Sequence, residues 1–444
     1  MDRAEAEDYV YRSYLNAEKH WDRDSRDSVK RHPEYSKGIL ESMSHTPSVV
    51  VTGSKGKGSV SMMISVILST EFRVGLMTSP HILSFNERFR IGDEAISDMD
   101  LISHTERIKG LFDPIESTIP EGTCISPMGI QSAIALSYFN ENGTDIDIFE
   151  CGKGAKNDDV NNIPHRYSVI NTIFLEHTRE LGGTLEEIAE DKSHVITGGE
   201  ECVYVAEQDG AVMDILRKRA GGLDVRMKVY GRDFRSDNIR YTQEGMMFDV
   251  HVGDISIADV TIPLLGGYQA RNCALAMAIC SDILKKMDHD RIRSALSGIS
   301  WPGRFEMICA RPIVILDACI NSRSCEEMIP IIDEMGIDGP NVIIGIPDDK
   351  DFIGVSKTIA PVSNRITMTR SDNPHYVFSP SQTEHLRDEG IEAEWSDSLE
   401  KAIGDSFDGD RCILILGTTS VVSQVKRMQS DGTLTRIFDG CGER

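Results

Sequence analysis

The stretch VVVTGSKGKGSVSMMISVIL, Val49 to Leu68, decides the fold of the chain around it. It opens with an apolar, β-branched run at 49–52 that is typical of a short buried strand. A glycine-rich turn follows at 53–59, and apolar residues then recur at helical spacing. Glycines let backbone N–H groups point inward, and a helix N-terminus carries partial positive charge, so this arrangement predicts a cradle for an anion.

Two side chains in this turn suit phosphate chemistry. Lys57 is placed to reach terminal phosphates, and the Ser59 hydroxyl is placed to ligate Mg²⁺. The spacing Gly-x-x-Gly-Lys-Gly-Ser is shorter than the common phosphate-binding pattern Gly-x-x-x-x-Gly-Lys-Ser/Thr. The alternative is a plain glycine-rich surface turn. Because the lysine and the serine both stand where phosphate binding needs them, we favour the phosphate site.

The composition indicates a soluble α/β protein with no affinity for nucleic acid or membranes. The 444 residues allow two or three domains. No apolar run approaches the roughly 18–20 residues of a membrane span, and the acidic N-terminus is unlike a secretory signal. The formal net charge of −24 repels nucleic acid, so a phosphate ligand needs a focused local site. We attribute the charge itself to solubility or to a salt-adapted host.

The ten cysteines are scattered and include no Cys-x-x-Cys pair. This pattern predicts free buried thiols in a reducing cytoplasm rather than disulfides or a zinc site.

Apolar patterns predict two α/β domains, 1–299 and 300–444, with Pro302 and Gly303 marking the boundary. Strands alternate with helices, which favours mostly parallel sheets with helices on both faces. Residues 238–265 instead show short alternating segments typical of β structure. The expected strands, besides 49–52, are 74–78, 145–150, 168–173, 313–316, 342–346, 365–368 and 412–416.

Helix starts carry local signals. Ser97 is a predicted N-cap, and Thr184 with Glu187 forms a predicted capping box for a helix that carries Lys192. Residues 1–45 have a helical pattern, with an apolar face that is expected to contain Tyr9, Tyr11, Tyr14 and Leu15.

Glu150 and His177 each follow a predicted strand of the first domain. Because the carboxyl ends of parallel strands share one edge of a sheet, we expect both beside the loop 53–59. A carboxylate, a hydroxyl and an imidazole around a triphosphate suit Mg²⁺. Taken singly, each residue has a commoner interpretation, namely a hydrogen-bonded loop histidine and a solvated carboxylate.

Six segments, in order along the chain, together resemble the folylpolyglutamate synthase branch of the Mur ligase family. They are TGSKGKGS from Thr52, VGLMTSPHILSFNERFRI from Val74, ECGKGAKNDDVN from Glu150, IFLEHTRELGGTLEEIAEDKSHVI from Ile173, PLLGGYQARNCALA from Pro263 and WPGRFE from Trp301.

The resemblance implies an N-terminal P-loop ATPase domain with a mostly parallel sheet and a smaller C-terminal Rossmann-like domain, with the active site between them. It implies that ATP phosphorylates a substrate carboxylate, giving an acyl phosphate and ADP, and that an amine then forms an amide. In this branch the acid is a pteroate or folate and the amine is glutamate. A monomeric cytoplasmic enzyme using ATP and two Mg²⁺ ions is implied as well.

The resemblance also assigns roles to single residues. Lys57, His177 and Lys192 are the implied catalytic residues, with Lys192 carbamylated, and the implied metal ligands are Ser59, Glu150, His177 and Lys192. Two cations would neutralise the γ-phosphate and the attacking carboxylate. Implied ATP contacts are Gly53, Gly56, Lys57, Gly58, Ser59, Asn272, Arg304, Asp317 and Lys350. Implied contacts to the acid or the amino acid are Ser79, Pro80, His81, Phe85, Asn86, Arg88, Asp158 and His375.

Four departures from the family pattern leave the substrates open. Ile320 replaces a histidine, Glu176 an aspartate, Met128-Gly129 an aromatic-Glu pair, and His375 the arginine of the Asp-Asn-Pro-Arg found in some cell-wall ligases. An arginine there would bind a carboxylate through two parallel hydrogen bonds, which histidine cannot do.

Three hypotheses therefore stand. The chain is a folate-type polyglutamate ligase, a ligase acting on another pterin or cofactor acid and acceptor, or a nucleotide-binding protein without ligase activity. The joint presence of Lys57, Ser59, Glu150, His177 and Lys192 argues against the third, because a protein without catalysis has no need for all five.

Overall fold

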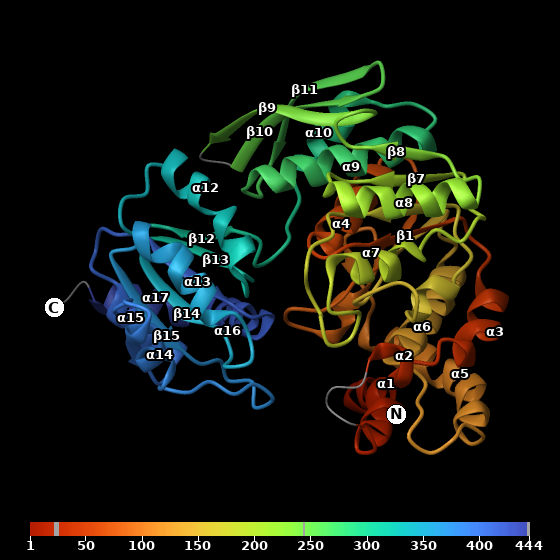
Figure 1. The fold of residues 1–444 in the computed structure, drawn as a ribbon, viewed down its shortest axis with the longest axis horizontal. Coiled ribbons are helices and arrows are strands. Elements are labelled where there is room, and N and C mark those ends of the chain that lie inside the picture. The colour runs from red at the N-terminus through yellow and green to blue at the C-terminus, as the bar shows by residue number, and fades with distance from the viewer. Residues whose placement is uncertain (22–25, 243–244, 442–444) are drawn as a thin grey trace. The chain divides into compact units, whose positions relative to one another are not determined.

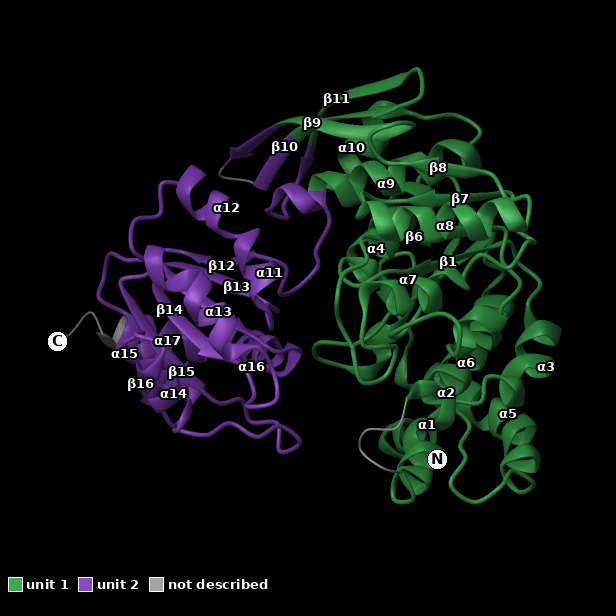
Figure 2. Cartoon of the chain, in the orientation of Figure 1, with its two compact units in different colours: residues 1–238, 248–260, 270–297 green, residues 239–247, 261–269, 298–444 purple. Residues whose placement is uncertain are grey.

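The computed structural model describes residues 1–21, 26–242 and 245–441 (Figure 1). The chain forms two compact units (Figure 2). Unit 1 comprises residues 1–238, 248–260 and 270–297, and unit 2 comprises residues 239–247, 261–269 and 298–444.

Unit 1 is built on an eight-stranded sheet with the strand order β4-β3-β2-β5-β1-β6-β7-β8. Six strands are parallel, while β3 and β4 add an antiparallel edge. The central strands are buried at every residue, as expected for parallel strands that are covered on both faces. The bounds are β1 Ser48–Thr52, β2 Val74–Met77, β3 Phe89–Ile91, β4 Glu94–Ala95, β5 Ile146–Glu150, β6 Tyr167–Ile170, β7 Cys202–Val205 and β8 Met227–Val229.

The predicted strand 168–173 is too long at its C-terminal end. Strand β6 ends at Ile170, and Asn171 Oδ1 accepts a hydrogen bond from Thr172 N at 2.8 Å. Such a side-chain bond to the next backbone amide competes with the sheet ladder, so the chain turns away one residue after the strand.

The helices of unit 1 cover this sheet, with α4 packed against β1, β2 and β5. The two cap predictions are confirmed: Ser97 Oγ accepts from Asp100 N, and Thr184 and Glu187 form a complete capping box. The prediction for Leu15 is wrong, since it is 52% exposed while Ala6, Tyr9 and Val10 form the buried face. The helices are α1 Arg3–Glu18, α2 Asp27–Lys30, α3 Glu34–Met43, α4 Lys57–Leu68, α5 Asp98–Glu116, α6 Pro127–Asn142, α7 Leu185–Ser193, α8 Gly210–Gly222, α9 Gly267–Ile283 and α10 His289–Ser297, with 3-10 turns η1 Phe85–Arg88 and η2 Asp159–Asn162.

The β-rich character expected for residues 238–265 is confirmed. Strands β9 (Phe234–Thr242), β10 (Gly245–Val252) and β11 (Ile255–Ile262) form a three-stranded sheet in the order β11-β10-β9. Each of these strands contributes residues to both units.

Unit 2 contains a six-stranded sheet in the order β12-β13-β17-β14-β15-β16, with only β12 antiparallel. The four predicted strands are confirmed to within about a residue, whereas the short edge strands β12 and β16 were not predicted. The strands are β12 Glu306–Ala310, β13 Ile313–Asp317, β14 Asn341–Gly345, β15 Arg365–Thr369, β16 Glu394–Ser396 and β17 Ile413–Gly417. The helices are α11 Ser322–Glu326, α12 Ile329–Glu334, α13 Phe352–Ile359, η3 Ala360–Val362, α14 Gln382–Asp388, α15 Leu399–Ser406, α16 Thr419–Ser430 and α17 Thr433–Cys441.

Within the described part of the chain, no helix is both long and apolar enough to cross a membrane. The cysteines whose side chains are described are free thiols, and all of them except Cys309 are buried, as the sequence predicts.

Replacing either of two glycines of unit 1 by alanine should change the free energy of unfolding, in opposite directions. A Cβ on Gly75, in β2, would lie 2.7 Å from the buried ring of Phe139 and would also meet the Asp147 carboxylate. We expect Gly75→Ala to lower the free energy of unfolding by about 1–3 kcal/mol. Gly110 lies on the exposed side of α5 with open space around it, so Gly110→Ala should raise that free energy by about 0.5–1 kcal/mol. Urea denaturation followed by circular dichroism measures both, and an unchanged or higher free energy of unfolding in Gly75→Ala would contradict the packing described for β2.

Candidate active site

The glycine-rich loop 53–59 connects the carboxyl end of β1 to α4. Gly53 and Gly56 have φ angles of 141° and 79°, in the region that favours glycine. A Cβ on Gly53 would lie 2.8 Å from Asn171 Cβ, and one on Gly56 would lie 2.6 Å from Asn171 Nδ2. Backbone conformation and close packing therefore both require glycine. No side chain caps α4, so the N–H groups of its first turn face the loop, where an anion binds favourably.

Two lysine ammonium groups converge on this loop. Lys57 Nζ donates to the Gly53 carbonyl oxygen at 3.0 Å, and Lys192 Nζ, which comes from α7, donates to the same oxygen at 3.0 Å. Lys192 is fully buried and also donates to the carbonyl oxygen of Lys153. Two positive charges beside a helix N-terminus make a strong binding site for a polyanion.

Burial lowers the pKa of Lys192, and the nearby ammonium of Lys57 lowers it further. The Glu176 carboxylate, with Oε1 at 3.0 Å from Lys192 Nζ, opposes this shift. Lys192 therefore holds its proton less firmly than an exposed lysine does.

Ser59 and Glu150 supply oxygen atoms beside the loop. Ser59 is 1% exposed, and among the described residues its Oγ has no hydrogen-bond partner. Glu150 ends β5 opposite Val51 of β1, is 3% exposed, and accepts a hydrogen bond from Ser79 N at 2.9 Å. A buried hydroxyl without a partner and a buried carboxylate are donors that fit Mg²⁺.

His177 lies in the loop after β6, in a left-handed conformation with φ of 46°. Its Nε2 is 3.8 Å from Glu176 Oε2, and its side chain is 40% exposed. Burial lowers the pKa of His177, which favours the neutral imidazole that ligates metals. Among the described residues, no three His, Cys, Asp or Glu side chains are grouped to hold a metal ion, so a second Mg²⁺ at His177 stays a prediction.

Asn272 lies beside the loop, as expected for a nucleotide contact. Asn171 Nδ2 donates to Asn272 Oδ1 at 2.9 Å, and Asn272 Nδ2 would lie 3.0 Å from a Cβ on Gly56. Asn171 is not among the residues predicted from sequence. The feature that could have indicated it is its position, one residue beyond a buried strand that pairs with β1.

The segment 79–88 holds six of the residues predicted to contact the substrates, in two different settings. Ser79 binds Glu150, whereas Phe85, Asn86 and Arg88 are at most 8% exposed. Asn86 Nδ2 donates to Ile96 O at 2.8 Å and to Asp98 Oδ1 at 2.9 Å. Asn86 therefore fastens the loop to the start of α5, while the role of the segment towards a substrate stays a prediction.

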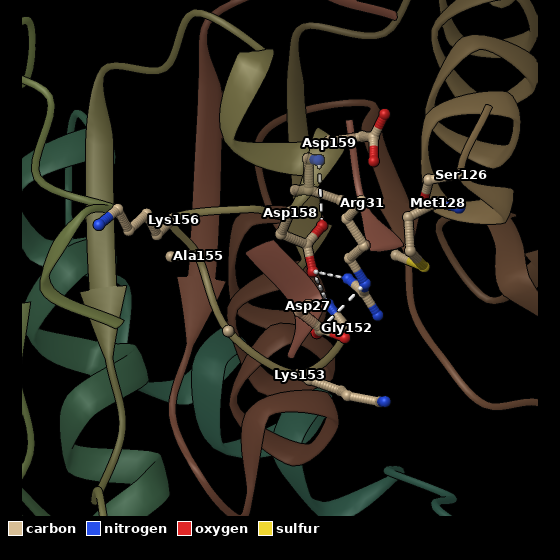
Figure 3. Close-up of polar contacts among 12 residues, drawn as sticks. Asp27, Arg31, Ser126, Met128, Gly152, Lys153, Ala155, Lys156, Asp158 and Asp159 are labelled. Atoms are coloured by element: carbon tan, nitrogen blue, oxygen red, sulfur yellow. Dashed lines mark hydrogen bonds and ion pairs between the residues drawn. The ribbon is translucent and has the colours of Figure 1, made fainter. Parts of the chain in front are cut away.

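Asp158, another predicted substrate contact, lies at the centre of a buried polar cluster (Figure 3). Its carboxylate accepts from Gly152 N at 2.8 Å and Val160 N at 3.1 Å, and lies 3.5 Å from Arg31 Nη1. Arg31 also pairs with Asp27 at 3.3 Å. Arg31 could not be predicted from local sequence, because only the tertiary fold brings it to this loop.

The unusual Met128-Gly129 pair has a packing explanation in the same cluster. Asp159 Oδ1 accepts from Ser36 Oγ at 2.6 Å and would lie 2.5 Å from a Cβ on Gly129. Glycine at the first turn of α6 therefore leaves room for the Asp159 carboxylate, which is favourable beside a helix N-terminus.

The remaining predicted residues belong to unit 2. Asp317 ends β13 and accepts from Phe305 N at 2.7 Å, and Arg304 donates to Gly303 O at 3.0 Å. Lys350 and His375 lie on loops. Asn373 and Pro374 line a cavity of about 550 Å³ with Arg370, Asp397, Leu399 and Gln424, among others. Contacts of these residues to ATP or to an amino acid stay predictions.

The central part of the chain matches a known protein family. The family described as Mur ligase middle domain matches residues 51–280, just over half of the sequence. A folylpolyglutamate synthase from Lacticaseibacillus casei is 26% identical over 384 residues, which cover 85% of this chain and 88% of that protein. A probable bifunctional folylpolyglutamate synthase/dihydropteroate synthase from Haloferax volcanii is 29% identical over 391 residues. This match covers 85% of the chain but only 45% of the bifunctional protein.

Solved structures share the fold. A folylpolyglutamate synthase from Thermotoga maritima has a TM-score of 0.82 at 23% identity, with 98% of this chain and 99% of that chain covered. The ADP complex of the Mycobacterium tuberculosis enzyme has a TM-score of 0.84 at 21% identity, with coverages of 96% and 99%. The expected α/β fold with mostly parallel sheets is therefore confirmed.

Proposed function

Because the chain belongs to the Mur ligase family, in its folylpolyglutamate synthase branch, we propose that it is an ADP-forming ligase. It joins the carboxylate of a folate- or pteroate-type acid to an amino acid, with L-glutamate as the acceptor. The names of its relatives support these substrates, and the residues beside the loop 53–59 support the use of ATP.

One observation carries the proposal: Lys57 and Lys192 reach the same carbonyl oxygen of Gly53. Two ammonium groups repel each other, and a bound polyphosphate would remove that repulsion. Lys57 and the N–H groups of α4 then hold the β- and γ-phosphates. Ser59 and Glu150 would hold Mg²⁺, which when bound neutralises charge on the γ-phosphate and the attacking carboxylate.

The reaction has two steps. A carboxylate oxygen of the acid attacks the γ-phosphorus, the bond from that phosphorus to the bridging oxygen breaks, and ADP leaves. The glutamate amine then attacks the acyl carbon, the carbon–oxygen bond to phosphate breaks, and the nitrogen loses a proton as the amide forms. The chain's part is to hold the reacting groups in line and to exclude water from the acyl phosphate.

A second candidate keeps this chemistry with a different acid. Asp159 occupies the space beside Gly129, and Arg31 pairs with Asp158 at the place where the family places substrate contacts. Charged groups in such a position would discriminate between acids that carry different ring substituents.

Substrate-dependent ADP release tests the proposal. Purified protein with Mg·ATP should release ADP only when both an acid and an amino acid are present. A panel of folate, tetrahydrofolate and dihydropteroate, each with glutamate or another amino acid, identifies the pair. Tetrahydrofolate with glutamate is the expected best pair. ADP release that is independent of every acid would contradict ligase activity.

Lys57→Ala should reduce ADP formation at least about 100-fold, because it removes a charge aimed at the transferred phosphate. Lys37→Ala, at an exposed position of α3, is the matched control and should keep the parental rate. Equal rates in the two variants would show that the loop 53–59 is not the ATP site.

Lys192 is predicted to react with CO₂ to give a carbamate that contributes oxygen ligands for Mg²⁺. Its lowered pKa exposes the neutral amine that attacks CO₂. Lys192→Ala should lose activity, and acetate should restore part of it. Mass spectrometry after chemical trapping of the carbamate checks the modification directly. An unmodified Lys192 in the active, nucleotide-bound protein would exclude it.

A further inference from the structure

The ring of His81 is held by a guanidinium group. Arg88 Nε, at the end of η1, lies 2.9 Å from His81 Nδ1 and donates a hydrogen bond to it. An arginine Nε–H is always a donor and never an acceptor. His81 Nδ1 must therefore accept, which leaves the ring proton of the neutral imidazole on Nε2.

Arg88 is itself fixed in place. Its Nη1 donates to Gln131 Oε1 of α6 at 2.7 Å, and Gln131 Nε2 donates to Pro127 O at 3.0 Å, which sets the orientation of that amide. The guanidinium carbon lies 5.2 Å from the centre of the Phe85 ring, and Arg88 is only 8% exposed. Arg88 thus reaches His81 from a rigid base on α6 and offers little surface to a ligand.

The surroundings keep His81 neutral. Burial and the charge of Arg88 lower the pKa of His81 to about 4, with Arg3 acting in the same direction and Glu87 opposing it. The Phe85 ring also packs against His81, with 5.8 Å between the two ring centres. His81 therefore stays uncharged from pH 5 to pH 8.

The Nε2–H donor of His81 belongs to the segment 79–88, whose first residue contacts Glu150. The loop that carries His81 leaves β2 beside β5, where Met77 pairs with Phe149, and Ser79 N donates to Glu150 Oε2 at 2.9 Å. The position of His81 is two residues beyond this contact. Within the part of the chain that the structure describes, Arg88 is the only hydrogen-bond partner of the His81 ring, on Nδ1.

We propose that Arg88 is a positioning residue that fixes His81 as the Nε2–H tautomer, and that His81 donates this hydrogen bond to a carboxylate oxygen of the acid substrate beside Glu150. The inference rests on the proposed function and assigns separate roles to two residues that the family resemblance groups together.

A neutral donor suits this reaction. The attacking carboxylate must remain unprotonated to reach the γ-phosphorus, and an imidazolium next to it is acidic enough to give up a proton. A neutral imidazole N–H orients the carboxylate without protonating it.

Nitrogen-15 NMR of histidine-labelled protein tests the tautomer without any need for activity. The signal of His81 is the one that is present in the wild-type spectrum and missing from that of His81→Gln. The wild type should show a neutral Nε2–H ring from pH 5 to pH 8. In Arg88→Met, His81 should populate both tautomers, and its pKa should rise while staying below the ordinary value, because burial still lowers it. Arg90→Met, two residues along the chain, is the control and should leave the His81 signal unchanged. An Nδ1–H tautomer, or an imidazolium at pH 7, in the wild type would overturn the proposal.

Steady-state kinetics with tetrahydrofolate, glutamate and ATP test the contact. His81→Leu should raise the KM for tetrahydrofolate about tenfold or more, which is the effect expected for losing a hydrogen bond to a charged group, and should change the KM for ATP less than twofold. His81→Gln, which retains an N–H donor, should recover most of the loss. Equal changes in both KM values, or no recovery in His81→Gln, would reduce His81 to a structural residue.

The two experiments separate this inference from the proposed function. If the wild type releases no ADP with any acid, the proposed function fails and the contact to the acid fails with it, while NMR still decides the role of Arg88. If the wild type ligates glutamate but its His81 carries the proton on Nδ1, only the present inference fails.

Discussion

The carbonyl oxygen of Gly53 is the point on which the site depends, because two buried or half-buried ammonium groups donate to it. Lys57 comes from the helix that follows the loop, and Lys192 comes from α7, which is more than a hundred residues further along the chain. Helix α7 is held in turn by Asp191, whose carboxylate accepts from Ala155 N at 2.9 Å. These contacts therefore connect three segments around a concentration of positive charge: strand β1, the loop after β5 and helix α7. A chain with a formal net charge of −24 binds a polyphosphate through such local focusing.

The sheet brings the other groups to the same edge. Because β1 lies between β5 and β6, Glu150 at the end of β5 and Asn171 just after β6 flank the loop. Glu150 also fixes the start of the next loop through Ser79 N. Each polar side chain is thereby positioned by backbone that is itself buried, which is the arrangement that precise phosphoryl transfer requires.

Much of this could be predicted from sequence, because the signals are local. The run from Val49 to Leu68 encodes its own strand, turn and helix, and the caps at Ser97 and Thr184 are each read from four residues. Local patterns could not place Arg31 against Asp158 or Gln131 against Arg88, because those contacts join segments far apart in the chain. Leu15 was misplaced because the apolar face of α1 was judged from large side chains, whereas the buried stripe also uses Ala6 and Ser13. Edge strands β12 and β16 are short and partly exposed, and so carry a weak pattern.

Transfer of oxygen from the acid to phosphate tests the central claim most directly. Tetrahydrofolate labelled with ¹⁸O in its side-chain carboxylate is incubated with the protein, Mg·ATP and glutamate, and the released inorganic phosphate is analysed by mass spectrometry or ³¹P NMR. Formation and breakdown of an acyl phosphate must leave a labelled oxygen on the phosphate, so the account predicts one ¹⁸O atom per phosphate and per amide formed. Unlabelled phosphate, in reactions that do form the amide, would contradict it.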